Sequence, residues 1–237
     1  MSQSYQPSSE PIPAHRRAMI LERLRTLGSV SINDLADYLQ VSASTVRRDL
    51  DELMQEGALE RFLELLEGEV KALRVGDPLD EATQMGPLIS RAQHEIVASF
   101  LEDGAPVAFR GSAPEGPGFW FAPTVLAPVS PGERVAREEV FGPIAAVIPF
   151  ADEAEAVRIA NDTIYGLSGS IWTRDGARAL RVARAIDSGV LSINSNTSVR
   201  VATPFGGFKQ SGYGRELGPH ALDAYTEVKS IYYSTSS

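Results

Sequence analysis

The spacing of apolar residues changes along this chain, and the change limits the folds it can adopt. In residues 14–54, apolar side chains recur three and four positions apart, which is the period of an amphipathic helix. From residue 143 onward, short apolar runs alternate with helical stretches. The expected strands are 144–150, 168–173 and 190–194, and the expected helices between them are 152–161 and 175–186. The sequence therefore predicts a small all-α segment followed by an α/β segment with a mostly parallel sheet.

Three short helices are expected in the front segment. The first fits residues 14–27 and stops at Gly28, because glycine commonly ends a helix. Ser31 and Ser42 are placed to cap the free N–H groups at the starts of the second and third helices. A tight turn between these two helices is typical of a helix-turn-helix, whose third helix enters the DNA major groove by its N-terminal end.

The start of the third helix carries side chains suited to DNA. Ser44 and Thr45 can bond phosphates or bases, and Arg47 and Arg48 can reach phosphates or guanine edges. The whole chain has a net charge of −9, yet residues 14–48 hold six arginines against three carboxylates. This local excess favours DNA contact over the alternative, a plain three-helix bundle with solvated charges.

The front segment resembles a known family. Residues 42–50, Ser-Ala-Ser-Thr-Val-Arg-Arg-Asp-Leu, are similar to the signature of the DeoR-type winged helix-turn-helix of bacterial transcriptional regulators. The resemblance implies operator binding through the four side chains named above. Residues 13–60 would form this domain, after a disordered tail at 1–12. The family continues into a β-hairpin wing, but here Phe62, Leu65, Leu66, Val70 and Leu73 fit one acidic amphipathic helix, so the wing is missing or rebuilt.

The rest of the chain resembles a second family. Eight segments occur in that family's order, at residues 76–79, 86–89, 123–125, 138–144, 161–167, 194, 204–218 and 225–229. They are similar to motifs of the aldehyde dehydrogenase superfamily. Residues 61–237 are therefore interpreted as a partial, truncated aldehyde dehydrogenase-like region, containing part of a catalytic domain and an oligomerisation segment.

The second resemblance implies roles for five residues. Glu139 would hold the ribose hydroxyls of the nicotinamide, and Phe141 would pack near the nicotinamide ring. Phe205 would line the aldehyde pocket. Arg215 and Glu227 would form an ion-pair network near a subunit interface. NAD(P) is implied as cofactor by this resemblance alone.

The chemistry of that family requires a cysteine, and this chain has none. In the family, a cysteine thiolate attacks the aldehyde and a glutamate activates water. Both groups lie upstream of the matched region, in the place that the helix-turn-helix occupies here. The chain is therefore predicted to be inactive alone, with no catalytic residue and no tightly bound cofactor. His15, His94 and His220 show no metal-ligand spacing, so no metal site is expected.

Partners follow from the same patterns. Residues 225–233 alternate like an exposed terminal strand, which predicts a homodimer formed through that strand. DNA is the expected macromolecular partner, and a small-molecule effector is a further expectation for a regulator. No apolar run approaches the ~20 residues of a membrane span, and the N-terminus is polar, so a cytoplasmic protein is expected.

Three functional interpretations remain open. The first is a DeoR-type DNA-binding transcriptional regulator fused to a catalytically incomplete aldehyde dehydrogenase region. The second is an NAD(P)-dependent oxidoreductase of the aldehyde dehydrogenase family, present as a partial or inactive chain. The third is a fusion of two gene fragments that has neither activity.

Overall fold

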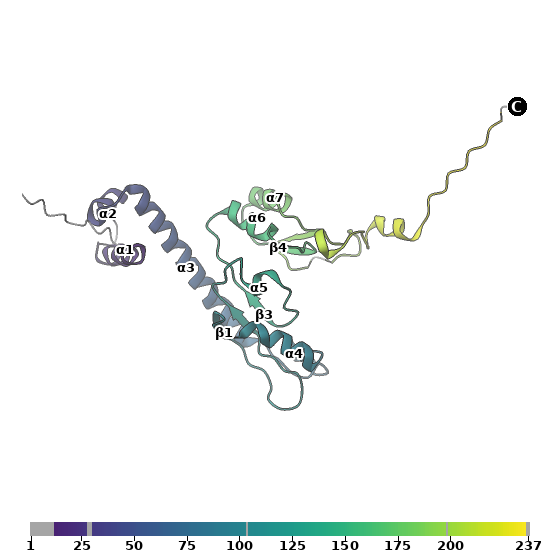
Figure 1. Ribbon diagram of the computed structural model, residues 1–237, viewed down its shortest axis with the longest axis horizontal. Coiled ribbons are helices and arrows are strands. Elements are labelled where there is room, and N and C mark those ends of the chain that lie inside the picture. Colours follow the sequence, from purple (N-terminus) through teal and green to yellow (C-terminus); the bar gives the residue numbers. More distant parts are fainter. Residues whose placement is uncertain (1–11, 28–29, 103, 198, 236–237) are drawn as a thin grey trace, which may run out of the picture. The chain divides into compact units, whose positions relative to one another are not determined.

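A computed structural model describes residues 12–235 except 28, 29, 103 and 198 (Figure 1). The chain divides into two compact units, Met1–Ala151 and Asp152–Ser237, and each is described by itself. The tail expected at residues 1–12 lies outside the described residues apart from Ile12, which is exposed.

The first unit begins with the three expected helices, α1 (Pro13–Leu27), α2 (Ile32–Leu39) and the start of α3 (Ala43–Ala72). Both predicted caps are confirmed: the hydroxyl oxygens of Ser31 and Ser42 each accept a hydrogen bond from a backbone N–H three residues on, at 3.1 Å. The five buried residues of the helical core are Ile20, Leu35, Ala36, Leu39 and Val46. The helix-turn-helix is thus a packed unit with its own apolar centre.

Helix α3 differs from expectation, because it runs unbroken for 30 residues where the sequence predicts two helices (Figure 1). Its only strong helix breakers are Gly57 and Gly68, which cost about 1 kcal/mol each relative to alanine and do not by themselves end a helix. No β-hairpin wing follows the helix-turn-helix in the described residues, since their first strand begins at Val107. The boundary expected near residue 60 therefore falls inside one helix.

The C-terminal half of α3 packs on a three-stranded sheet. The strands are β1 (Val107–Arg110), β2 (Thr124–Leu126) and β3 (Ile144–Ala146), in the order β1-β2-β3. The β1–β2 pair is antiparallel and the β2–β3 pair is parallel. The α3 side chains that contact this sheet are Leu63, Leu66 and Val70, whereas the expected inward residues Phe62 and Leu65 are exposed. The helix is therefore rotated relative to the predicted face.

Three short helical elements complete the first unit: α4 (Arg91–Ala98), the 3-10 turn η1 (Ser99–Leu101) and α5 (Arg134–Arg137). They surround a second apolar cluster of Val97, Phe100 and Val140. Strand β3 is shorter than the predicted 144–150, and Val147 after it still donates a backbone hydrogen bond to Leu126 of β2.

The second unit keeps the predicted alternation of helix and strand. Its elements are α6 (Glu153–Asn161), β4 (Ser168–Ile171), α7 (Gly176–Ala185), β5 (Val190–Ile193), η2 (Lys209–Ser211) and η3 (Pro219–Tyr225). Strands β4 and β5 pair in parallel. Of the three strand pairs in the described chain, two are parallel, so the mostly parallel α/β prediction is confirmed, as two small sheets.

The predicted strand at 225–233 is wrong. Tyr225 ends η3, and residues 226–235 have no regular secondary structure. Val228 is fully exposed, although its alternation with polar neighbours suits a strand. A strand needs a neighbour for its N–H and C=O groups, and no described segment of this chain pairs with these residues.

None of the helices in the described part of the chain combines the length and the apolar character needed to cross a bilayer.

Candidate nucleic-acid interface and dehydrogenase-like residues

The first two turns of α3 contain the four residues predicted to contact DNA. Ser44, Arg47 and Arg48 are exposed, and Thr45 is half-buried. The hydroxyl of the cap, Ser42, lies 2.7 Å from the Ser44 hydroxyl and 2.9 Å from that of Thr45. These hydroxyls therefore gather at the positive end of a helix, where the backbone N–H groups already favour an anion such as a DNA phosphate. The two arginine side chains form no ion pair with another described residue.

A buried ion pair fixes the position of α3 against α1. The guanidinium of Arg16 donates to both carboxylate oxygens of Asp49, at 2.7 and 3.0 Å, and their side chains are 6% and 1% exposed. Beside this pair, Arg17 binds Glu52 and Glu56. Two of the six front arginines are thus neutralised within the helical bundle. The basic surface left for DNA is narrower than the sequence count indicates, and it includes the first turns of α3.

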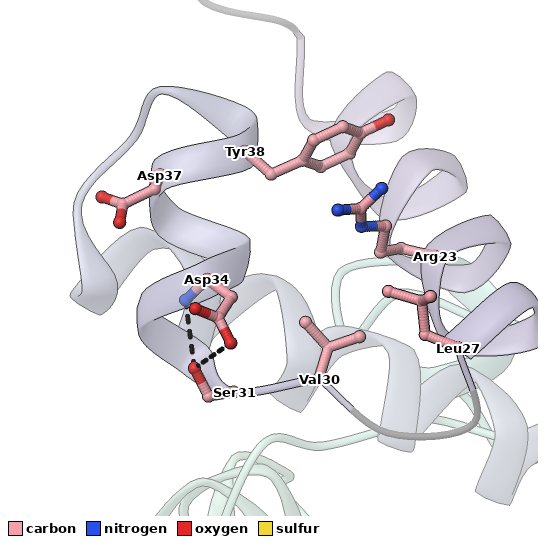
Figure 2. Close-up of a pocket in the computed structure, with 7 residues that line it drawn as sticks. All are labelled: Arg23, Leu27, Val30, Ser31, Asp34, Asp37 and Tyr38. Carbon is pink, nitrogen blue, oxygen red and sulfur yellow. Dashed lines mark hydrogen bonds between the residues drawn. The ribbon is translucent and has the colours of Figure 1, made fainter.

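A pocket of about 800 Å³ lies between α1 and α2, and Val30 and Ser31 also line it. Figure 2 shows the side chains that line this pocket. The Arg23 guanidinium lies 4.5 Å from the centre of the Tyr38 ring, and the Ser31 hydroxyl donates to the Asp34 carboxylate at 2.7 Å. The pocket lining contains none of the four residues predicted to contact DNA. Its polar groups are largely paired with one another, so the pocket and the candidate DNA interface are separate features.

Two dehydrogenase-like residues, Glu139 and Phe141, lie after α5 in the first unit. Val140 between them is buried in the cluster beside α4, whereas Glu139 is exposed and Phe141 is 71% exposed. Phe141 has a φ of 51°, and its carbonyl accepts a hydrogen bond from the Gln93 amide at 3.0 Å. The loop is therefore anchored at its centre while both candidate side chains face solvent. An exposed carboxylate of this kind suits binding to ribose hydroxyls.

Phe205 lies in the second unit, at the start of a glycine-rich loop. It is half-buried, and its backbone pairs with that of Glu216 at 2.7 and 2.9 Å. A Cβ atom added to Gly189 would lie 1.8 Å from the Gly206 carbonyl, and one added to Gly207 would lie 2.5 Å from the Ser211 carbonyl. These glycines therefore allow the loop to pack closely against the start of β5 and against its own turn.

The two residues predicted to form an ion pair are not brought together. Arg215 instead donates to the carbonyls of Gly207 and Gly214, at 3.1 and 2.6 Å, and its guanidinium lies 5.2 Å from the Phe208 ring centre. Glu227 is exposed in the irregular segment that follows η3. Arg215 therefore stabilises the glycine-rich loop, and a network with Glu227 remains a prediction.

An ion-pair cluster that no sequence motif predicted lies between α6 and α7. Glu153 accepts hydrogen bonds from Arg181 at 2.6 and 2.8 Å and from Arg178 at 3.1 Å. The pKa of Glu153 is lowered, and the hydrogen bond from Arg181 is the largest cause. The positive charge of Arg181 and the interaction with Arg178 lower it further, while some desolvation acts in the opposite direction. The three-residue spacing of Arg178 and Arg181 places both on one face of α7, and this spacing was the available signal in the sequence. It could not predict the cluster, because the carboxylate of Glu153 comes from another helix.

Glu153→Gln is expected to lower the melting temperature of the second unit at neutral pH. A carboxyl whose pKa is depressed by folding stabilises the fold above its unfolded pKa, and this stability is lost as the pH falls through the folded pKa. The difference between the variant and the parent chain should therefore shrink in acid. Thermal melts from neutral pH into the range where glutamate protonates measure it. Glu115→Gln, in an exposed loop, is the control, and an equal effect in both variants would contradict the assignment.

Residues 52–231 match the aldehyde dehydrogenase family, and residues 16–64 match the DeoR-like helix-turn-helix domain. The chain therefore belongs to the aldehyde dehydrogenase family and carries a DeoR-like helix-turn-helix at its front. The two matches overlap at residues 52–64, within α3. Helix α3, which is a single element in the structure, therefore contains residues matched by both families.

Similar proteins are dehydrogenases of greater length. Betaine aldehyde dehydrogenases of Mesorhizobium japonicum and Agrobacterium fabrum are each 45% identical, over 77% of this chain and 39% and 38% of their own lengths. The NAD⁺ complex of betaine aldehyde dehydrogenase from Staphylococcus aureus is 37% identical with a TM-score of 0.66, covering 70% of this chain and 35% of that one.

The NAD⁺ complex of an aldehyde dehydrogenase from Bacillus cereus is 37% identical with a TM-score of 0.70, covering 75% of this chain and 37% of that one. This chain thus spans about two fifths of the length of the curated relatives it matches.

Proposed function

We propose that this chain is a DNA-binding transcriptional regulator of DeoR type, joined to a catalytically incomplete part of an aldehyde dehydrogenase. The observation that supports this proposal most directly is the exposure of Ser44, Arg47 and Arg48 on the first two turns of α3, a helix held in place by the buried Arg16–Asp49 pair. A rigid helix presenting hydroxyls and guanidinium groups at its N-terminus suits base and phosphate contacts in the major groove. Such a regulator acts on an operator in the cytoplasm.

The dehydrogenase-derived part would serve as an effector or assembly region. Glu139 and Phe141 are the residues that would contact a nicotinamide nucleotide, and Phe205 would contact an aldehyde-sized ligand. Any such binding is expected to be weak, because the matched region is about two fifths of the relatives' length. When bound, the nucleotide would supply a hydride-accepting ring. This chain would only hold one end of the nucleotide, through the exposed carboxylate of Glu139.

Salt-dependent DNA binding tests the proposal. The full chain should bind DNA from upstream of its own gene more tightly than scrambled DNA of equal length. The logarithm of the affinity should fall linearly with the logarithm of the salt concentration, with a slope near −0.9 per phosphate neutralised. Fluorescence anisotropy at several salt concentrations measures both quantities. Equal affinity for the two DNAs at every salt concentration would contradict operator recognition.

A second candidate is an aldehyde dehydrogenase-family oxidoreductase, favoured by the 45% identity to betaine aldehyde dehydrogenases. We expect no NAD(P) reduction by the purified chain with a panel of aldehydes that includes betaine aldehyde. The reason is that the covalent step of the family needs a cysteine thiolate, and the sequence contains no cysteine. Absorbance at the reduced-nicotinamide band measures turnover, with an intact dehydrogenase as positive control. Clear turnover would favour the oxidoreductase.

A further inference from the structure

The middle of α3 carries apolar side chains that the described part of the chain leaves exposed. Its two ends are packed, with Val46 in the core of the front helices and Val70 against the three-stranded sheet. Between them, Met54, Phe62 and Leu65 expose 65%, 51% and 62% of their surfaces. These side chains contribute little to either core. The packing of this chain therefore does not explain why these apolar side chains occur at exposed positions.

The exposed residues form a narrow stripe, defined as Met54, Ala58, Phe62 and Leu65. Their spacing is four, four and three residues, so at about 100° per residue they fall within an arc of about 80° on the helix surface. The glutamates of this stretch, Glu56, Glu60 and Glu64, lie outside that arc by the same geometry. A narrow apolar seam flanked by charge is typical of a helix that pairs with another helix.

We propose that the α3 stripe is covered by the same stripe of a second copy of this chain, in an antiparallel pair centred on Ala58. In this register Met54 of one copy lies level with Phe62 of the other. Arg47 and Glu69, both exposed in the single chain, stand near opposite ends of α3, so this register keeps the two Arg47 side chains apart and the two Glu69 side chains apart. A parallel pair would instead bring Arg47 against Arg47 and Glu69 against Glu69. The charges thus favour the antiparallel arrangement.

The centre of the pair has little side-chain bulk. Ala58, at the centre, has the smallest side chain of the stripe and is exposed. Small residues at a helix crossing let the two backbones approach closely. The larger side chains on either side can then interdigitate across the pair.

The resulting spacing suits two DNA half-sites, a step that rests on the proposed function. The centre of the DNA-contacting turn, near residue 46, is 12 residues from Ala58, or about 18 Å along the helix. Two antiparallel copies therefore place these turns about 36 Å apart, against ~34–36 Å between half-sites one helical turn apart. The pair would present two recognition helices related by a two-fold axis.

The pair is expected to be weak in the absence of DNA. Three large side chains, each half to two thirds exposed, supply roughly 100 Å² apiece, so two stripes bury roughly 600 Å². Stable interfaces bury about 1,200 Å² or more in total. Association should therefore depend on concentration and be strengthened when two adjacent half-sites hold both copies.

Directed cross-linking tests the register, and the absence of native cysteines makes each introduced thiol unique. Ala58→Cys should yield a covalent dimer of the full chain under mild oxidation, because only the central residue faces itself across the pair. A disulfide needs Cα atoms about 4.4–6.8 Å apart, so Glu60→Cys, on another face of α3, should not dimerise. Adding Phe62→Glu to Ala58→Cys should slow cross-linking at least tenfold. Circular dichroism checks that each variant keeps its helical content.

Several outcomes would overturn the pairing. One is equal cross-linking of Ala58→Cys and Glu60→Cys, and another is no covalent dimer from Ala58→Cys at the highest soluble concentration. Protection of the Ala58→Cys thiol from maleimide without dimer formation would show that something other than a second copy covers the stripe. Each result can be told apart from failure of the proposed function. A chain that cross-links but does not bind its upstream DNA supports the pair and contradicts the regulator. A chain that binds single half-sites without cross-linking supports DNA binding and contradicts the pair.

Discussion

Replacing Arg47 and Arg48 with alanine together should weaken binding to the upstream DNA by roughly 30-fold or more at moderate salt. Both side chains are exposed on the first turns of α3, and one good arginine contact to a guanine edge contributes about 1–3 kcal/mol. A loss of about 1 kcal/mol from each gives about 2 kcal/mol, and each 1.4 kcal/mol is tenfold in affinity. The magnitude of the salt slope should also fall by about 1–2, because fewer phosphates are neutralised.

A matched variant separates local contact from overall charge. Arg110→Ala with Arg174→Ala removes the same two positive charges from exposed positions outside the helix-turn-helix. This pair of changes should leave the affinity within about twofold, since distant surface charges act mainly through screened attraction. Anisotropy titrations of both double variants on the same DNA make the comparison. An equal loss of DNA affinity in the two double variants would contradict the assignment of α3 as the recognition helix.

Asp49→Ala should destabilise the front helices by about 3–5 kcal/mol. The change removes the carboxylate that accepts two hydrogen bonds from the buried Arg16 guanidinium, and breaking a buried ion pair from one side costs about this much. The loss is large against the roughly 5–15 kcal/mol that holds a whole domain. Hydrogen exchange of amides in α1, α2 and the front of α3, compared with amides of β1–β3, should localise the effect in the full chain.

Two further variants test the cause. Glu56→Ala removes a partner of Arg17 that is 54% exposed and 3.6 Å away, and it should cost about 1 kcal/mol or less. Replacing both buried partners, as Arg16→Met with Asp49→Leu, should recover most of the stability, because an apolar pair of similar size carries no desolvation cost. Should Asp49→Ala and Glu56→Ala behave alike, the buried pair would not be the clamp between α1 and α3.

The sequence predicted the local elements well where a cap or a regular period was present. Ser31 and Ser42 begin α2 and α3 as expected, and α6 follows its predicted span closely. Such signals act within one or two turns, so they can be read from neighbouring residues alone. Three features were missed because they depend on distant partners: the unbroken α3, the exposure of Phe62, and the lack of a strand at 225–233.

The candidate DNA interface was predicted from the sequence, but its electrostatics were not. The sequence counts six arginines in residues 14–48, whereas in the structure Arg16 and Arg17 face carboxylates of α3. An ion pair between residues more than 30 positions apart is set by how α1 packs on α3. The dehydrogenase-like residues show the same limit, because motif position places Arg215 near the C-terminus but cannot show that it binds Gly207 and Gly214.

By itself, the sequence determined that this chain joins a helix-turn-helix to a dehydrogenase-like α/β region, and that it contains no cysteine for that family's covalent step. Periodicity, caps and motifs are local properties, and they persist whatever the rest of the chain does. Only the tertiary structure decided that the two parts share α3, and that its middle is left exposed with an apolar stripe. The physical reason is that burial depends on which surfaces meet, and surfaces from distant parts of a sequence meet only once the chain has folded.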